Sequence, residues 1–268
     1  MKKLLLPILT ALVLTKAACA HDTWLETNTN IFRVGDAAHV ELKLGNHGND
    51  HRDFKMAGKV DVAEIKIEAI SPSGKKLDLK NSLIDTGLSP KEGFWKTMVD
   101  LNEKGVYTID ETSDAVVSYA PKRSVKSAKT FVLASTSLDN VTPNQKGFEK
   151  RLGHAIELVP ETNPVAPMGP GTPIKLRLWF KDKPLANTKI SFIPEGVTLK
   201  EGFDSRYEVK TNVNGRASFE PKEAGKYLVA AHVETKEAGT NKAGQKYDYT
   251  AYSATLTVFV PALCPCCG

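Results

Sequence analysis

The chain has 268 residues, of which 41% are hydrophobic and 25% charged, the ordinary balance of a globular protein with one large or two medium-sized domains. Three of the lysines behind the formal net charge of +5 lie in the first 16 residues, so the rest of the chain carries 5 − 3 = +2. No basic cluster is interleaved with aromatic residues, which excludes nucleic acid as an expected partner.

Residues 1–20 have the pattern of a cleavable secretory signal. Two lysines precede an apolar run over residues 4–14, and Ala18-x-Ala20 matches a signal peptidase site. The run is too short to span a bilayer, and no later stretch is long and apolar enough to do so. We therefore expect a periplasmic protein that does not itself span a membrane and that begins, after cleavage, at His21.

A lipoprotein signal is the competing interpretation of the same segment. In that case Cys19 would carry the lipid. Such signals place an aliphatic residue three positions before the cysteine, whereas this chain has Lys16 there. The cleavable signal is therefore favoured.

Short segments in which apolar and polar residues alternate follow one another along the chain. They lie at residues 39–44, 64–70, 129–134, 174–180, 189–194, 226–233 and 254–260. This period of two is typical of half-buried β-strands, and no long stretch shows a helical period. We predict an all-β protein.

A weak internal repeat divides the chain into two halves. Residues 33–45 resemble residues 169–180, and 101–110 resemble 221–230, where Gly-x-Tyr opens a late strand. A tyrosine at that place is similar to the tyrosine corner of immunoglobulin-like sandwiches, whose hydroxyl ties down the preceding turn. The repeat predicts two tandem immunoglobulin-like β-sandwich domains.

The predicted boundaries follow from this repeat and from a polar stretch between the halves. An N-terminal sandwich (21–135) is followed by a linker (136–153), a C-terminal sandwich (154–261) and a Cys-rich tail (262–268). In the second half, residues 181–192 resemble the strand-turn-strand of carboxypeptidase-regulatory-like modules. Such modules bind other molecules or act as spacers, and they rarely catalyse reactions. Asn214-Gly215 predicts a β-hairpin between two strands.

His21 is the sharpest candidate for a metal ligand. A terminal histidine can chelate one ion through its α-amine and its imidazole Nδ1, and one more histidine completes a planar three-nitrogen set suited to Cu(II) or Ni(II). The alternative is a solvated terminus that follows the cleavage site by chance. Trp24 and Leu25, a few residues after His21, should anchor this end of the chain in the hydrophobic core.

Four further histidines are weaker candidates. His47 and His51 lie on a loop after a predicted strand and could converge on one ion, or could be solvated. His154 opens the second half, where a structural hydrogen bond competes with metal binding. His232 stands in a mostly apolar strand, as a hydrogen-bonded core residue or as a ligand at the junction of the domains.

Three of the four cysteines, Cys264, Cys266 and Cys267, lie in the last five residues. They could chelate a soft ion such as Cu(I) or Zn(II), form a disulfide, or be inert. No serine-hydrolase elbow, zinc-protease helix, phosphate loop or dinucleotide motif is present, so we do not expect an enzyme.

Four motifs resemble the DUF4198 family of exported bacterial proteins. They are "AHDTWLE" after the signal, "LKLGNHG", "LGHAIELVPETNP" at mid-chain and "NGRASFEPKEAGKYLVAAH". The resemblance implies a periplasmic component of cobalt or nickel uptake with a membrane transporter as partner. Position by position it implies His21 and His47 as ligands, with His154 in the central motif.

The leading hypothesis is a periplasmic protein that binds a divalent transition metal (Ni, Co or Cu) in uptake or homeostasis. One alternative is a copper redox enzyme with a histidine brace, and another is a β-sandwich adhesion or spacer module. A flat aromatic face would favour the enzyme, but Trp24, Trp95 and Trp179 are scattered in sequence.

Overall fold

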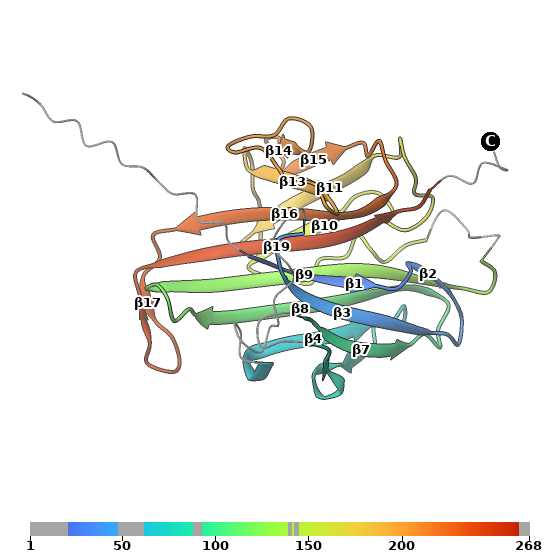
Figure 1. The fold of residues 1–268 in the computed structure, drawn as a ribbon, viewed down its shortest axis with the longest axis horizontal. Coiled ribbons are helices and arrows are strands. Elements are labelled where there is room, and N and C mark those ends of the chain that lie inside the picture. Colours follow the sequence, from blue (N-terminus) through green and yellow to red (C-terminus); the bar gives the residue numbers. More distant parts are fainter. Residues whose placement is uncertain (1–20, 48–61, 88–92, 139–140, 142–144, 263–268) are drawn as a thin grey trace, which may run out of the picture.

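The computed structural model describes residues 21–47, 62–87, 93–138, 141 and 145–262. Apart from two short 3-10 turns, η2 (Val62–Glu64) and η3 (Lys80–Ser82), the regular structure of these residues is entirely β-strand, which confirms the all-β prediction (Figure 1). The first half contains β1 (Asp22–Thr27), β2 (Ile31–Arg33), β3 (Ala37–Gly45), β4 (Ile65–Ile70), β5 (Lys76–Asp78), β6 (Ile84–Asp85), β7 (Trp95–Asp100), β8 (Gly105–Val116) and β9 (Lys122–Ser135).

The second half contains the remaining strands, which are β10 (Ile156–Pro160), β11 (Ile174–Phe180), β12 (Lys183–Pro184), β13 (Lys189–Pro194), β14 (Glu208–Lys210), β15 (Arg216–Phe219), β16 (Gly225–Thr235), β17 (Gly239–Thr240), β18 (Lys246–Tyr247) and β19 (Tyr249–Val260). Every segment predicted from alternation forms a strand, and β9 and β19 extend well beyond their predicted bounds. The predicted part of β9 is the part buried on both faces, with Phe131 and Leu133 in one core and Val132 and Ala134 in the other.

Two hydrophobic cores confirm the two predicted β-sandwiches. In the first, the sheet β1-β3-β7-β6 packs on β4, β8 and β9 through residues such as Leu25, Leu42 and Ile109. In the second, β10, β11 and β15 pack on β13, β16 and β19 through residues such as Leu176 and Phe192. Each fully buried side chain of this kind contributes about 1.5–3 kcal/mol.

The two sandwiches share one sheet. The nine-stranded sheet includes the order β14-β13-β16-β19-β9-β8-β4-β5, with β2 also paired to β9, and so runs through both halves (Figure 1). The joint is a parallel pairing of residues 249–256 of β19 with residues 122–129 of β9. The segment 136–153 joins β9 to β10, but this backbone pairing also fixes the two halves to each other.

Both predicted tyrosine corners are present. The Tyr107 hydroxyl accepts a hydrogen bond from the Glu103 backbone N–H at 2.7 Å, and the Tyr227 hydroxyl donates to the Glu223 carbonyl at 3.0 Å. Each tyrosine thus anchors the turn four residues before it, which supports the immunoglobulin-like character of both sandwiches.

The hairpin predicted at Asn214-Gly215 is a tight turn whose flanking strands separate. Gly215 has φ +72°, and its N–H donates to the Asn212 carbonyl at 2.9 Å. β14 then pairs with β13, whereas β15 pairs with β11 in the other sheet. The turn prediction is correct and the strand pairing is wrong, because β14 and β15 belong to different sheets.

Candidate metal-binding site

The first strand, β1, lies across the shared sheet. β1 pairs with β3 at the edge of its own sheet and also contacts β9 and β19. The Lys126 ammonium on β9 donates to the His21 carbonyl and to the Thr23 hydroxyl, both at 3.1 Å. The Thr255 hydroxyl on β19 donates to the Thr23 carbonyl at 2.7 Å. The backbone next to His21 is therefore fixed by both halves of the chain.

Asp22 and His232 form a contact across the junction of the halves. His232 Nε2 donates to Asp22 Oδ1 at 2.7 Å, over a sequence separation of 210 residues. The Asp22 residue is 8% exposed, whereas the His232 side chain is 45% exposed. His232 is thus a partly accessible residue of the junction and not a core residue.

Charge near Asp22 favours its ionised form. Burial alone would raise the pKa of Asp22, but the charges of His232, Lys126 and His21 together hold that pKa below its usual value. In return, the Asp22 carboxylate raises the pKa of His232. The rings of His21 and His232 therefore both act on one carboxylate, which places them in the same part of the molecule.

His47 follows β3 and packs its ring against β1. Its Nδ1 donates to the Ile193 carbonyl at 3.0 Å, and its ring meets the Trp24 ring edge-on at a centroid distance of 5.6 Å. Its Nε2 lies 3.9 Å from Glu26 Oε1, and burial lowers the pKa of the ring. Because Gly45 pairs with Asp22, the backbone of His47 lies near the start of β1, while its ring is directed toward Trp24 and Glu26.

His154 lies on the opposite face of the shared sheet. Its Nε2 bonds to Asp110 Oδ1 at 2.8 Å, beside a buried ion pair between Lys129 and Glu157, also at 2.8 Å. His154 lines a cavity of about 340 Å³ between β8, β9 and the start of β10. The structural hydrogen bond expected for this histidine is present.

Four candidate residues, His51, Cys264, Cys266 and Cys267, lie outside the described residues. Within the described part, no group of three or more His, Cys, Asp or Glu residues is arranged to hold a metal ion. A complete set at His21 would need a further donor, which the α-amine of a chain beginning at His21 would supply. The nitrogen donors of His21 and His232 fit a Cu(II) or Ni(II) ion in kind.

Sequence reasoning missed Asp22 and Lys126. Asp22 follows His21 directly and Lys126 lies three residues before the alternating segment of β9, so their places in sequence suggested only solvated charges. Their roles depend on partners more than 100 residues away. No local pattern marks such contacts.

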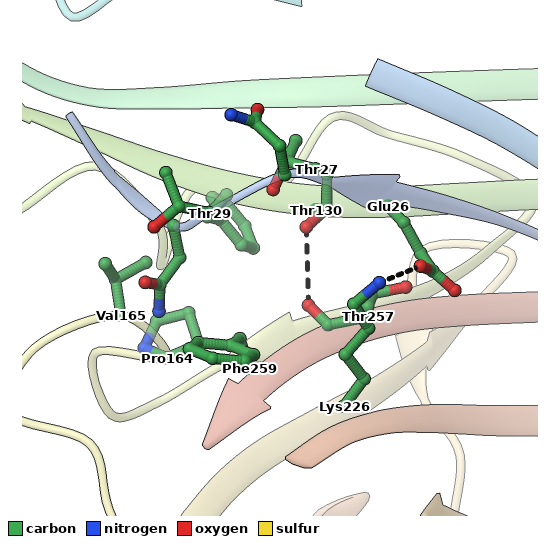
Figure 2. Close-up of a pocket in the computed structure, with 12 residues that line it drawn as sticks. Glu26, Thr27, Thr29, Thr130, Pro164, Val165, Lys226, Thr257 and Phe259 are labelled. Atoms are coloured by element: carbon green, nitrogen blue, oxygen red, sulfur yellow. Dashed lines mark hydrogen bonds and ion pairs between the residues drawn. The ribbon is translucent and has the colours of Figure 1, made fainter. Parts of the chain in front are cut away.

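A small cavity lies at the far end of β1 and is unrelated to the histidines (Figure 2). Its volume of about 30 Å³ is that of roughly one water molecule. Figure 2 shows Lys226 paired with Glu26 on one side and the Thr130 hydroxyl directed at Thr257 on the other. Such a space suits a bound water and is too small for an organic ligand.

Comparison with known proteins gives one family. Residues 18–235 match the model described as a domain of unknown function, DUF4198. No curated protein matches the chain. No helix in the described residues has the length and apolarity needed to span a membrane.

Several solved structures are similar at low identity. A DUF4785 family protein from Legionella pneumophila is 10% identical with a TM-score of 0.28, and the match covers 88% of this chain and 56% of that one. The Yersinia pseudotuberculosis adhesin InvE is 11% identical with a TM-score of 0.23, over 88% and 58%. Murine CEACAM1b is 10% identical with a TM-score of 0.22, over 90% and 100%.

The chain thus spans little more than half the length of the Legionella protein. TM-scores this low carry no argument about function, and the fold rests on the strands and cores described above. The family match is of a different kind, because it covers most of the chain, including His21, His47, His154 and His232. The protein belongs to the DUF4198 family.

Proposed function

We propose that the protein is exported to the periplasm, begins at His21 after cleavage, and binds a divalent transition metal through that residue. In this role it serves metal uptake or homeostasis together with a membrane transporter. The metal is Ni(II), Co(II) or Cu(II), ions for which imidazole and amine nitrogens are suitable ligands.

The contact between Asp22 and His232 is the observation that carries the proposal. Histidines that bind metals commonly donate their second ring N–H to a carboxylate, which sets the tautomer and the orientation of the ring. His232 Nε2 donates to Asp22 in this way at 2.7 Å, so Nδ1 keeps its lone pair for a ligand. The partial exposure of His232 leaves a path for an ion.

The anchoring of β1 adds a second element of support. A terminal residue that frays in solvent would have to be ordered when the metal binds, at an entropic cost. The Lys126 ammonium donates a hydrogen bond to the His21 carbonyl, and the Thr255 hydroxyl donates one to the Thr23 carbonyl. The two donors of His21 are therefore presented on an ordered strand close to His232.

Metal titration by calorimetry tests the proposal, on protein that begins at His21 and on protein with one Met added before it. The added residue converts the amine ligand into an amide without changing the core. We expect Ni(II) or Cu(II) affinity to fall by about 10- to 1,000-fold, or about 1.4–4 kcal/mol. Thermal unfolding of the metal-free forms should be equal.

Two histidine variants sharpen the test. His232→Ala should weaken binding by a similar factor, whereas His154→Ala, which removes the other histidine paired with an aspartate, should not. Equal affinity in the native and Met-extended proteins would rule out the terminal chelate. Intact-mass analysis of the exported protein checks independently that the chain begins at His21.

A further inference from the structure

The outer face of the β1-β3-β7-β6 sheet carries a histidine and a methionine directly opposite each other. His39 on β3 and Met98 on β7 are partners in the antiparallel register, and the two strands lie side by side in Figure 1. Their strand neighbours Ala38, Val40 and Val99 point into the core, so His39 and Met98 point outward. Opposite residues of such a pair have Cβ atoms about 4.5–5.5 Å apart.

Both side chains are unusual in this position. Met98 is 57% exposed, although methionine normally fills gaps in cores. His39 Nδ1 is shielded from solvent and has no hydrogen-bond partner among the described residues. A shielded polar atom without a partner costs about 1–3 kcal/mol, and a bound ion is one accepted reason for such an atom.

We propose that His39 and Met98 form a binding site for a soft monovalent metal ion, with Cu(I) as the ion it takes. A thioether sulfur is a soft ligand that selects Cu(I), and imidazole nitrogen also suits copper. With Cβ atoms this close, rotation of the two side chains can bring both donor atoms to one ion. Neither ligand carries charge, so the ion adds a single positive charge; Glu41, two residues from His39 on the same face, is paired with Lys43 at 3.2 Å.

This site is separate from the proposed site at His21. β1 separates His21, just before it, from Asn28, just after it, and the Asn28 backbone N–H donates to the His39 carbonyl. Seven residues in strand geometry span about 23 Å. The proposed site at His21 uses nitrogen donors for a divalent ion, whereas the site at His39 uses a thioether for a monovalent one. Each site can therefore fail in experiment without the other.

Competition titration with Cu(I) under anaerobic conditions, against a chromophoric Cu(I) chelator, tests the proposal. The full chain is used with Cys264, Cys266 and Cys267 changed to Ser, because thiolates would bind the same soft ion. Met98→Leu and His39→Gln should each lower Cu(I) affinity more than the 10- to 100-fold that loss of an outer-shell partner typically costs. Met168→Leu, the same change at a methionine that is only 8% exposed, should leave it unaltered.

Methyl NMR of methionine-labelled protein identifies the ligand directly. On addition of Cu(I), the Met98 methyl signal, assigned by its loss in Met98→Leu, should shift, and the Met168 signal should not. The proposal is overturned if the Met98 signal stays in place, if Met98→Leu binds as tightly as Met168→Leu, or if the protein retains no Cu(I) against the chelator.

Discussion

Glu111 on β8 is a buried carboxyl whose cost to stability can be measured. It is 0% exposed, and neither oxygen makes a well-formed hydrogen bond among the described residues. Burial raises its pKa from 4.5 to about 8, and the charge of Lys126 and the nearby Ser113 hydroxyl offset only part of that effect. The side chain is therefore protonated in the folded protein at neutral pH.

The substitution Glu111→Gln keeps the size of the protonated side chain and removes its titration. In the unfolded chain the glutamate ionises above pH 4.5, whereas the folded protein holds the proton until about pH 8. The free energy of unfolding therefore loses about 1.36 kcal/mol per pH unit across this window and is constant above it. At pH 7.0, two and a half units above 4.5, Glu111→Gln should stabilise the fold by about 3 kcal/mol.

Urea denaturation between pH 4.5 and 8.5 measures this effect. The gain from Glu111→Gln should be near zero at pH 4.5 and should grow with pH until it levels off near pH 8. Glu157→Gln is the matched control, since Glu157 is equally buried but paired with Lys129. That variant should destabilise the fold by about 3–5 kcal/mol, because it leaves the lysine buried without its partner. A Glu111→Gln gain that does not change with pH, or a loss at pH 7.0, would refute the reasoning.

Three further predictions concern the fold. Tyr227→Phe removes the hydrogen bond to the Glu223 carbonyl and should lower the free energy of unfolding, measured by urea denaturation, by about 1 kcal/mol. An unchanged free energy of unfolding would show that the tyrosine corner does not contribute to stability. Gly215→Ala places a Cβ within 2.8 Å of the Leu178 carbonyl oxygen, on a residue whose φ is +72°. The free energy of unfolding should fall by more than about 1 kcal/mol, which lowers the melting temperature. An unchanged melting temperature would contradict the turn geometry. Burial raises the pKa of the Glu26 carboxyl, but two lysines outweigh burial and lower that pKa to about 2. The ionised carboxylate therefore stabilises the fold above pH 4.5, and this stabilisation is lost as the pH falls toward 2. Glu26→Gln should remove up to about 3 kcal/mol of the pH dependence of the unfolding free energy at acid pH.

Much of the fold follows from local pattern. Alternating residues predict the strands, because a half-buried strand places every second side chain in the core. The Gly-x-Tyr repeat predicts two sandwiches with tyrosine corners, since the hydroxyl bonds within the same turn, four residues away. His21 and His232 could likewise be singled out from sequence alone, one by the signal-like pattern that precedes it and one by its place in an apolar strand.

Tertiary structure alone decided how the two halves join and what the histidines contact. The parallel pairing of β19 with β9 uses backbone groups, which every sequence offers alike, so no side-chain pattern specifies it. The same pairing sets the distance between the halves and brings His232 to Asp22, while packing of the layers places the His47 ring on Trp24. The burial of Glu111 could not be predicted from sequence either, because it depends on which sheet covers β8. Contacts between residues far apart in sequence arise from the packing of whole layers, and local periodicity reports only which face of a strand is covered.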